Sequence, residues 1–160
     1  KVCVIGSFAV GKTSLIRRFV SGIFSEEYLT TVGVKIDQKV VSLNDGDVLM
    51  MVWDLAGSDE FARVQKSHLA GSSGFLFVAD GTRPSTLEDV LQEADALESE
   101  FPGVTLALLI NKADLKDEWE VSPEKVEELN ARFPVWITSA MTGESVESAF
   151  ENLAERMIQS

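Results

Sequence analysis

A short stretch near the start of the chain has the residue types and spacing of a phosphate-binding loop. Residues 6–14 read Gly-Ser-Phe-Ala-Val-Gly-Lys-Thr-Ser, which fits the P-loop pattern G-x-x-x-x-G-K-S/T. An apolar run precedes the loop at residues 2–5 and a helical pattern follows it at residues 15–20, so it lies between a predicted strand and a predicted helix. Backbone N–H groups and the positive end of that helix would bind phosphate oxygens, while Lys12 would reach the β and γ phosphates and Thr13 would ligate Mg²⁺. The flanking pattern argues against a chance glycine loop, which is the competing interpretation.

Three further stretches indicate the class of P-loop protein, since the loop alone leaves ATPase, kinase and GTPase open. Asp54 and Gly57 follow an apolar run in the spacing D-x-x-G, where a carboxylate can hold a Mg²⁺-bound water and a glycine N–H can meet a γ-phosphate. Residues 111–114 read Asn-Lys-Ala-Asp after another apolar run, and Asp114 can accept from two adjacent N–H donors, which guanine has and adenine lacks. Residues 138–140 read Thr-Ser-Ala after the last strand pattern, where a backbone N–H can meet a base oxygen. In this order the motifs favour a guanine nucleotide.

Strand-like and helix-like patterns alternate along the chain, which predicts an α/β domain with a mostly parallel sheet. Two strand patterns joined by the turn signal at residues 44–47 should form an antiparallel pair at one edge of the sheet. Ser122 before Pro123 is typical of a helix N-cap. The predicted strands are 2–5, 32–43, 48–53, 75–79, 104–110 and 135–138, and the predicted helices lie near 15–20, 61–69, 84–97, 123–129 and 146–157.

Composition limits the classes of partner. The 160 residues, 45% of them apolar, suit one globular domain over residues 1–160. The net charge of −12 argues against a nucleic-acid partner and against direct adsorption to anionic lipid. The single cysteine, Cys3, excludes an internal disulfide and fits a reducing cytosol. No apolar run approaches the roughly 18 residues of a membrane span. We therefore expect a cytoplasmic location, with membrane attachment only through a tail not present in this chain.

The series of motifs resembles the Ras superfamily of small GTPases, and looks most like its Rab branch, over essentially the whole chain. The resemblance implies a three-layer P-loop NTPase G domain with about five helices. Its six-stranded, mostly parallel sheet would have the order 2-3-1-4-5-6, with strand 2 antiparallel. The implied activity is GTP hydrolysis by a monomeric, Mg²⁺-dependent switch that alternates between GTP and GDP states.

The resemblance also implies a set of site residues. Thr31 matches the loop threonine that ligates Mg²⁺ and contacts the γ-phosphate, Phe24 matches an aromatic that packs on guanine, and Tyr28 matches a tyrosine that closes over the phosphates. The catalytic positions would be Lys12, Thr31, Gly57 and Ser58, and the metal ligands Thr13, Thr31 and Asp54. The nucleotide site would comprise Ala9, Val10, Gly11, Lys12, Thr13, Ser14, Phe24, Tyr28, Thr31, Gly57, Asn111, Lys112, Asp114, Ser139, Ala140 and Met141.

Several positions depart from the family pattern. Phe8 and Ala9 stand where Ras has two glycines, and Ser58 stands where a water-positioning glutamine is usual. Leu55 replaces a threonine and Met141 replaces a lysine. Nucleotide binding relies on backbone N–H groups and on side chains that are present, so these departures predict slow hydrolysis and leave binding intact.

Partners would bind through switch I, at about residues 24–34, and switch II, at about residues 54–73. Trp53 matches an effector-facing aromatic of Rab-like proteins, and Ile36 and His68 hold the two neighbouring positions of that surface. We interpret His68 as a helix-surface residue in preference to a pH switch. Two alternatives stay open: a GTP-binding scaffold with negligible turnover, and a P-loop ATPase or kinase in which residues 111–114 match by accident.

Overall fold

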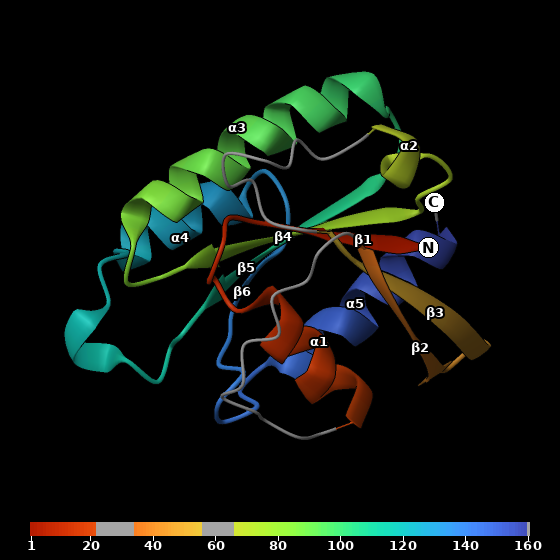
Figure 1. The fold of residues 1–160 in the computed structure, drawn as a ribbon, viewed down its shortest axis with the longest axis horizontal. Helices are drawn as coiled ribbons and strands as arrows, with labels where there is room; N and C mark the ends of the chain where they lie inside the picture. Colours follow the sequence, from red (N-terminus) through yellow and green to blue (C-terminus); the bar gives the residue numbers. More distant parts are fainter. Residues whose placement is uncertain (22–33, 56–65, 160) are drawn as a thin grey trace.

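The computed structural model describes residues 1–21, 34–55 and 66–159. Within these ranges it contains six strands, five α-helices and one 3₁₀ helix in alternating order (Figure 1). The strands are β1 (Val2–Ile5), β2 (Val34–Leu43), β3 (Gly46–Leu55), β4 (Gly74–Asp80), β5 (Thr105–Asn111) and β6 (Val135–Ile137). The helices are α1 (Lys12–Ser21), α2 (Lys66–Leu69), α3 (Pro84–Glu100), the 3₁₀ helix η1 (Lys116–Glu118), α4 (Pro123–Asn130) and α5 (Val146–Gln159).

The strands form one sheet in the order β2-β3-β1-β4-β5-β6. Neighbouring strands pair in parallel from β3 to β6, and β2 pairs with β3 in antiparallel register. This confirms the predicted strand order and the antiparallel edge strand. The parallel register follows from the alternation of strands and helices, because each helix returns the chain to the same end of the sheet.

Both faces of the sheet are covered by helices, which gives three layers (Figure 1). Successive residues of a strand point to opposite faces, and β1 shows the consequence. Val2 and Val4 belong to the core with α1 and α5, whereas Cys3 and Ile5 belong to the core with α2, α3 and α4. A strand buried on both faces therefore reads as an unbroken apolar run, which is why the sequence revealed the central strands so clearly.

A few element ends differ from the sequence prediction. β3 is longer than the predicted 48–53, because its ladder with β2 extends from Leu43 opposite Gly46 to Val34 opposite Leu55. The sequence placed Asn111 just after a strand, but it is the last residue of β5, opposite Asp80 of β4. The 3₁₀ helix η1 was not predicted, because three residues carry no hydrophobic period.

One predicted helix start is confirmed in detail. Ser122 caps α4, and its hydroxyl accepts a hydrogen bond from the Lys125 backbone N–H at 3.1 Å. Pro123 takes the first helical position, where its missing N–H costs nothing. Along the described ranges 1–21, 34–55 and 66–159, no helix combines the length and apolar composition needed to cross a membrane.

Candidate functional site

Polar side chains lie at the carboxyl ends of the central strands. Asp54 is near the end of β3, Asp80 ends β4 and Asn111 ends β5, and all three are buried. Because these strands and β1 are parallel, their ends lie at one edge of the sheet, beside the loop that follows β1. In the sheet, β3 lies on one side of β1 and β4 lies on the other, so the order of the strands reverses direction at β1. Ligands of open parallel sheets bind at such a switch point.

The backbone of the P-loop has the tight curvature that its glycines predict. Gly11 has φ +101°, and a Cβ at this position would lie 2.4 Å from Asn111 Nδ2, so a larger residue would push the loop off β5. Ala9 has φ +62°, a left-handed conformation that glycine adopts at lower cost. Alanine is therefore accommodated at this position at the expense of some backbone strain. Phe8 is 59% exposed, so its ring points out of the loop.

Lys12 begins α1 and lies within the P-loop. It is buried, and its Nζ donates to the Gly6 carbonyl at 2.9 Å and to the Ser7 carbonyl at 3.4 Å. The ammonium group is therefore held inside the curve of the loop, at the N-terminal end of a ten-residue helix. A buried cation and a helix N-terminus together favour an anionic ligand such as a phosphate chain.

Thr13 and Asp54 form the part of the site that would hold a cation. Thr13 Oγ1 donates to Asp54 Oδ2 at 2.5 Å, which joins α1 to the end of β3. Burial raises the pKa of Asp54 above its ordinary value, and the Thr13 hydrogen bond and the charge of Lys12 offset this only in part. A hydroxyl and a carboxylate are the hard oxygen ligands that suit Mg²⁺, which takes its remaining ligands from waters and phosphates. The two side chains thus fit the predicted magnesium site.

Two of the three ligands predicted for Mg²⁺, Thr13 and Asp54, lie among the described residues. Among the residues that the structure describes, no three His, Cys, Asp or Glu side chains gather into a metal site of their own. The third predicted ligand, Thr31, lies outside the described residues.

Asn111 connects the P-loop to the loop that follows β6, which the sequence predicts to face the base. Its Nδ2 donates to the Val10 carbonyl at 3.0 Å. Its Oδ1 accepts from Thr138 Oγ1 and from the Ala140 N–H, both at 3.2 Å. The motif asparagine therefore links the end of β5 to two loops, the P-loop and the loop that follows β6, and all three of these hydrogen bonds are buried.

Asp114 is held in place by the loop that follows β6. Ser139 Oγ donates to Asp114 Oδ1 at 2.7 Å, and the Thr142 N–H donates to Ser139 Oγ at 3.1 Å. Arg18 of α1 also donates to the Met141 carbonyl at 3.3 Å. The structure thus brings the predicted carboxylate together with residues 139–141 of the second predicted base-side stretch.

Lys112 makes a contact that the sequence analysis did not anticipate. Its Nζ pairs with Asp80 Oδ2 at 2.9 Å, and its φ of +72° is unusual for a residue with a side chain. Asp80 and Arg83 were missed as site residues, and Thr138 was named only as the first residue of its motif. The position of Asp80 could have indicated a site residue, because Asp80 ends a fully buried apolar strand. Asp54, near the end of β3, and Asn111, at the end of β5, hold similar positions.

Five predicted site residues lie outside the described residues, so their placement stays a prediction; they are Phe24, Tyr28, Thr31, Gly57 and Ser58. The other predicted residues flank the same edge of the sheet, in the P-loop, at the ends of β3 and β5, and in the loop before α5.

Comparison with known proteins agrees with this geometry. The family model of the Ras family matches residues 1–159. The chain belongs to the Ras family. Ras-related protein Rab-7b of Mus musculus is 34% identical over 167 residues, covering 99% of this chain and 82% of the relative. GTP-binding protein YPT1 of Saccharomyces cerevisiae is 31% identical, covering 100% of this chain and 79% of the relative. Ras-related protein Rab-4 of Dictyostelium discoideum is 35% identical, covering 94% and 75%. Membership of this family supports a small GTPase switch of the Rab-like kind.

Proposed function

We propose that this chain is a Mg²⁺-dependent switch that binds GTP and GDP and hydrolyses GTP slowly. The observation that carries the proposal is the fixed spacing between a phosphate end and a base end. Asn111 holds the Val10 carbonyl of the P-loop and the Ala140 N–H of the base-side loop with one side chain. A ligand that reaches both ends must carry phosphates and a base, which is the chemistry of a nucleotide.

Asp114 would select guanine over adenine as the base of the bound nucleotide. Its carboxylate is oriented by Ser139, and an oriented acceptor suits the adjacent ring and exocyclic N–H donors of guanine. Adenine places an acceptor where guanine has its ring N–H, so a carboxylate there would repel it. The Ala140 N–H lies in the same loop. It donates to Asn111 Oδ1 at 3.2 Å, and it would have to share that donor with the guanine oxygen in order to read the base. The relative YPT1 is named as GTP-binding, which supports the same choice.

At the phosphate end, different residues of the chain would bind the phosphates and the Mg²⁺ ion. Lys12 would bind the β and γ phosphates from inside the P-loop, and Thr13 would ligate Mg²⁺ while Asp54 holds a water of that ion. Bound Mg²⁺ would supply the charge that neutralises the phosphate oxygens. Thr31 and Gly57 would contact the γ-phosphate, so that its loss releases switch I and switch II.

Slow hydrolysis follows from two departures from the family pattern. Ser58 has too short a side chain to position the attacking water as glutamine does. Phe8 exposes its ring at the loop position nearest the expected γ-phosphate, where it would crowd the water and any arginine supplied by a partner. These two positions favour a long-lived GTP state. A GTP-binding scaffold with negligible turnover is the alternative, and single-turnover GTP hydrolysis distinguishes the two.

Regulators and effectors would bind through the two switch regions and the face of the sheet between them. Ile36 and Trp53 are opposite each other in β2 and β3, and the rings of Trp53 and His68 lie 6.5 Å apart. His68 is half-buried beside Trp53, so it is part of this surface. The protein would act as a cytoplasmic monomer, and its acidic charge continues to argue against nucleic acid.

Competition binding tests the proposal. GDP and GTP should displace a fluorescent GDP analogue at concentrations orders of magnitude below those required of ADP and ATP. Equal potency of adenine and guanine nucleotides would reject guanine selectivity and favour the ATPase or kinase alternative.

A further inference from the structure

Asp80 holds two cations that belong to different halves of the site. It ends β4, is fully buried, and its Oδ2 pairs with Lys112 Nζ at 2.9 Å and with Arg83 Nε at 3.0 Å. Its Oδ1 accepts from the Thr82 N–H at 2.8 Å and from the Thr82 hydroxyl at 2.7 Å. Both carboxylate oxygens therefore accept strong interactions: Oδ2 accepts charge-assisted bonds from two cations, and Oδ1 accepts two short hydrogen bonds.

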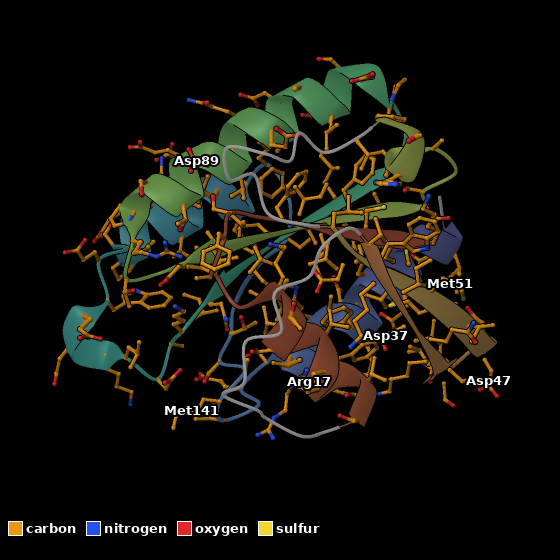
Figure 2. The ribbon with its side chains drawn as sticks, viewed as in Figure 1. Arg17, Asp37, Asp47, Met51, Asp89 and Met141 are labelled. Atoms are coloured by element: carbon orange, nitrogen blue, oxygen red, sulfur yellow. The ribbon has the colours of Figure 1, made fainter. Side chains whose placement is uncertain are left out.

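Arg83 extends this cluster to the P-loop. The same guanidinium that binds Asp80 donates through a second nitrogen to the Phe8 carbonyl at 2.9 Å. A continuous path thus runs from Lys112 through Asp80 and Arg83 to the P-loop, and no step of it exceeds 3.0 Å. Helix α3 makes a second tie to the loop, because Ser7 Oγ donates to Asp89 Oδ2 at 3.1 Å. Figure 2 shows Asp89 on α3, above the sheet, and Met141 below it, near the loop that leads to α5.

The turn that presents Asp80 and Arg83 is itself fixed. Thr86 is buried, and its hydroxyl accepts from the Asp80 N–H at 2.9 Å while it donates to the Arg83 carbonyl at 2.7 Å. Burial alone would raise the pKa of Asp80, but the hydrogen bonds from Thr82, Lys112 and Arg83 outweigh it and lower the pKa. The carboxylate is therefore an anion at neutral pH and can hold both cations in place.

We propose that Asp80 and Arg83 are positioning residues that join the base-side Lys112 to the phosphate loop and thereby slow the release of the guanine nucleotide. This inference rests on the proposed function and concerns the same site. A nucleotide held at both ends leaves when either end opens. A rigid link between Lys112 and the Phe8 carbonyl makes the two ends open together, which is rarer than the opening of one end alone.

The two residues contribute differently to this link. Without the Arg83 guanidinium, the Phe8 carbonyl loses its hydrogen bond from Arg83, while Lys112 keeps its ion pair with Asp80. Without the Asp80 charge, Lys112 and Arg83 lose their shared partner and face each other as like charges. Removal of Asp80 should therefore have the larger effect.

The test is the dissociation rate of a fluorescent GDP analogue from the whole 160-residue chain. Arg83→Ala should speed release about 10-fold and Asp80→Asn up to about 100-fold, the range that lost charged hydrogen bonds produce. Arg83→Lys should fall between wild type and Arg83→Ala, because an ammonium can replace one of the two bonds. Arg132→Ala is the matched control: this arginine pairs with Asp95 and Glu98 of α3, away from the loop, and its removal should leave the rate unchanged.

A double-mutant cycle separates positioning from mere stabilisation of the fold. If Arg83 acts on Lys112 through Asp80, Arg83→Ala combined with Lys112→Ala should speed release by less than the product of the two single effects. A purely structural role would lower the melting temperature and leave the release rate of the folded protein unchanged.

The outcomes also separate this inference from the proposed function. Wild-type protein that fails to bind GDP would overturn the proposed function. Wild-type protein that binds GDP, with Arg83→Ala releasing it at the wild-type rate, would overturn the positioning role alone. If Asp80→Asn does not fold, Arg83→Ala still decides the matter, since the Arg83 side chain is 44% exposed and its loss leaves the core intact.

Discussion

Two buried aspartates at the same edge of the sheet have opposite surroundings. Asp54 near the end of β3 and Asp80 at the end of β4 are both almost completely buried. Asp80 pairs with two cations and with both donors of Thr82. Asp54 accepts a hydrogen bond from the hydroxyl of Thr13.

The pKa shifts express this difference. Burial raises the pKa of both carboxyl groups, but at Asp80 the hydrogen bonds outweigh burial and the net shift is downward. At Asp54 the Thr13 hydrogen bond and the charges of Lys12 and Lys35 do not offset burial, and the net shift is upward. The negative charge of Asp80 is thus balanced by neighbouring groups of the protein. The negative charge of Asp54 is not balanced, which favours the binding of a cation beside it.

Substitution of a third carboxylate, Asp114, should have the largest effect on nucleotide binding, and the effects at Asp54 and Asp80 can be compared with it. Asp114→Ala would remove the proposed acceptor for two guanine N–H groups, which should weaken GDP binding by roughly 3 kcal/mol, or about 100-fold, and abolish selectivity over ADP. Competition binding measures both quantities. Asp117→Ala, a nearby exposed carboxylate of η1, is the control and should bind GDP as wild type does. A selective Asp114→Ala protein would show that another group reads the base.

Substitution by asparagine should change stability in opposite directions at the two buried sites. Asp80→Asn places an amide against Lys112 and Arg83 and should cost about 2 kcal/mol, since both cations are partly solvated. Asp54→Asn keeps an acceptor for Thr13 and removes an unfavourable buried charge, so it should stabilise the nucleotide-free protein by about 1 kcal/mol. Urea unfolding at pH 7 without nucleotide measures both. Two destabilised variants would refute the contrast between the sites.

The rate of GTP hydrolysis tests the proposed phosphate end of the site, where Asp54 would hold a water of Mg²⁺. Single-turnover GTP hydrolysis should be slow in the wild type, and Ser58→Gln should accelerate it about tenfold, well below the roughly 10³ to 10⁵ that an arginine finger supplies. Phe8→Gly should increase the response to an added arginine-bearing activator. Fast wild-type turnover that neither change affects would show that Asp59, Glu60 or another group positions the water.

The pH dependence of stability should also differ in sign. The lowered pKa of Asp80 contributes stability that is fully present above the unfolded value of about 4 and is lost as pH falls through the folded value. The raised pKa of Asp54 acts the other way, because stability falls as pH rises from about 4 through the folded value. The Asp80→Asn penalty should therefore shrink in acid, and so should the Asp54→Asn gain. Unfolding curves at several pH values check this, and a pH-independent penalty for Asp80→Asn would contradict it.

Local patterns in the sequence predicted the fold and most of the described site. The P-loop follows β1, Asp54 lies near the end of β3, and Asn111 ends β5, so the apolar run of each strand reveals the polar residues at its end. Parallel strand order then requires that these ends meet at one edge.

The link through Asp80 could not be predicted in the same way. Arg83 and the Phe8 carbonyl are 75 residues apart in the chain, and no periodicity connects them. The left-handed backbone of Lys112 likewise depends on tertiary contacts. Only the position of Asp80 at the end of a buried strand was visible in advance.

The dependence of GDP release on Mg²⁺ tests most directly whether Asp54 serves the cation and Asp80 does not. The release rate would be followed while Mg²⁺ is varied from chelated to millimolar, for wild type, Asp54→Asn and Asp80→Asn. We expect Asp54→Asn to need about 10- to 100-fold more Mg²⁺ than wild type for half of the effect on the release rate, because loss of an outer-shell carboxylate usually weakens metal binding by that factor. Asp80→Asn should release GDP faster at every concentration but show the wild-type Mg²⁺ requirement. An equal shift of the Mg²⁺ requirement in both variants would contradict the division of roles between the two aspartates.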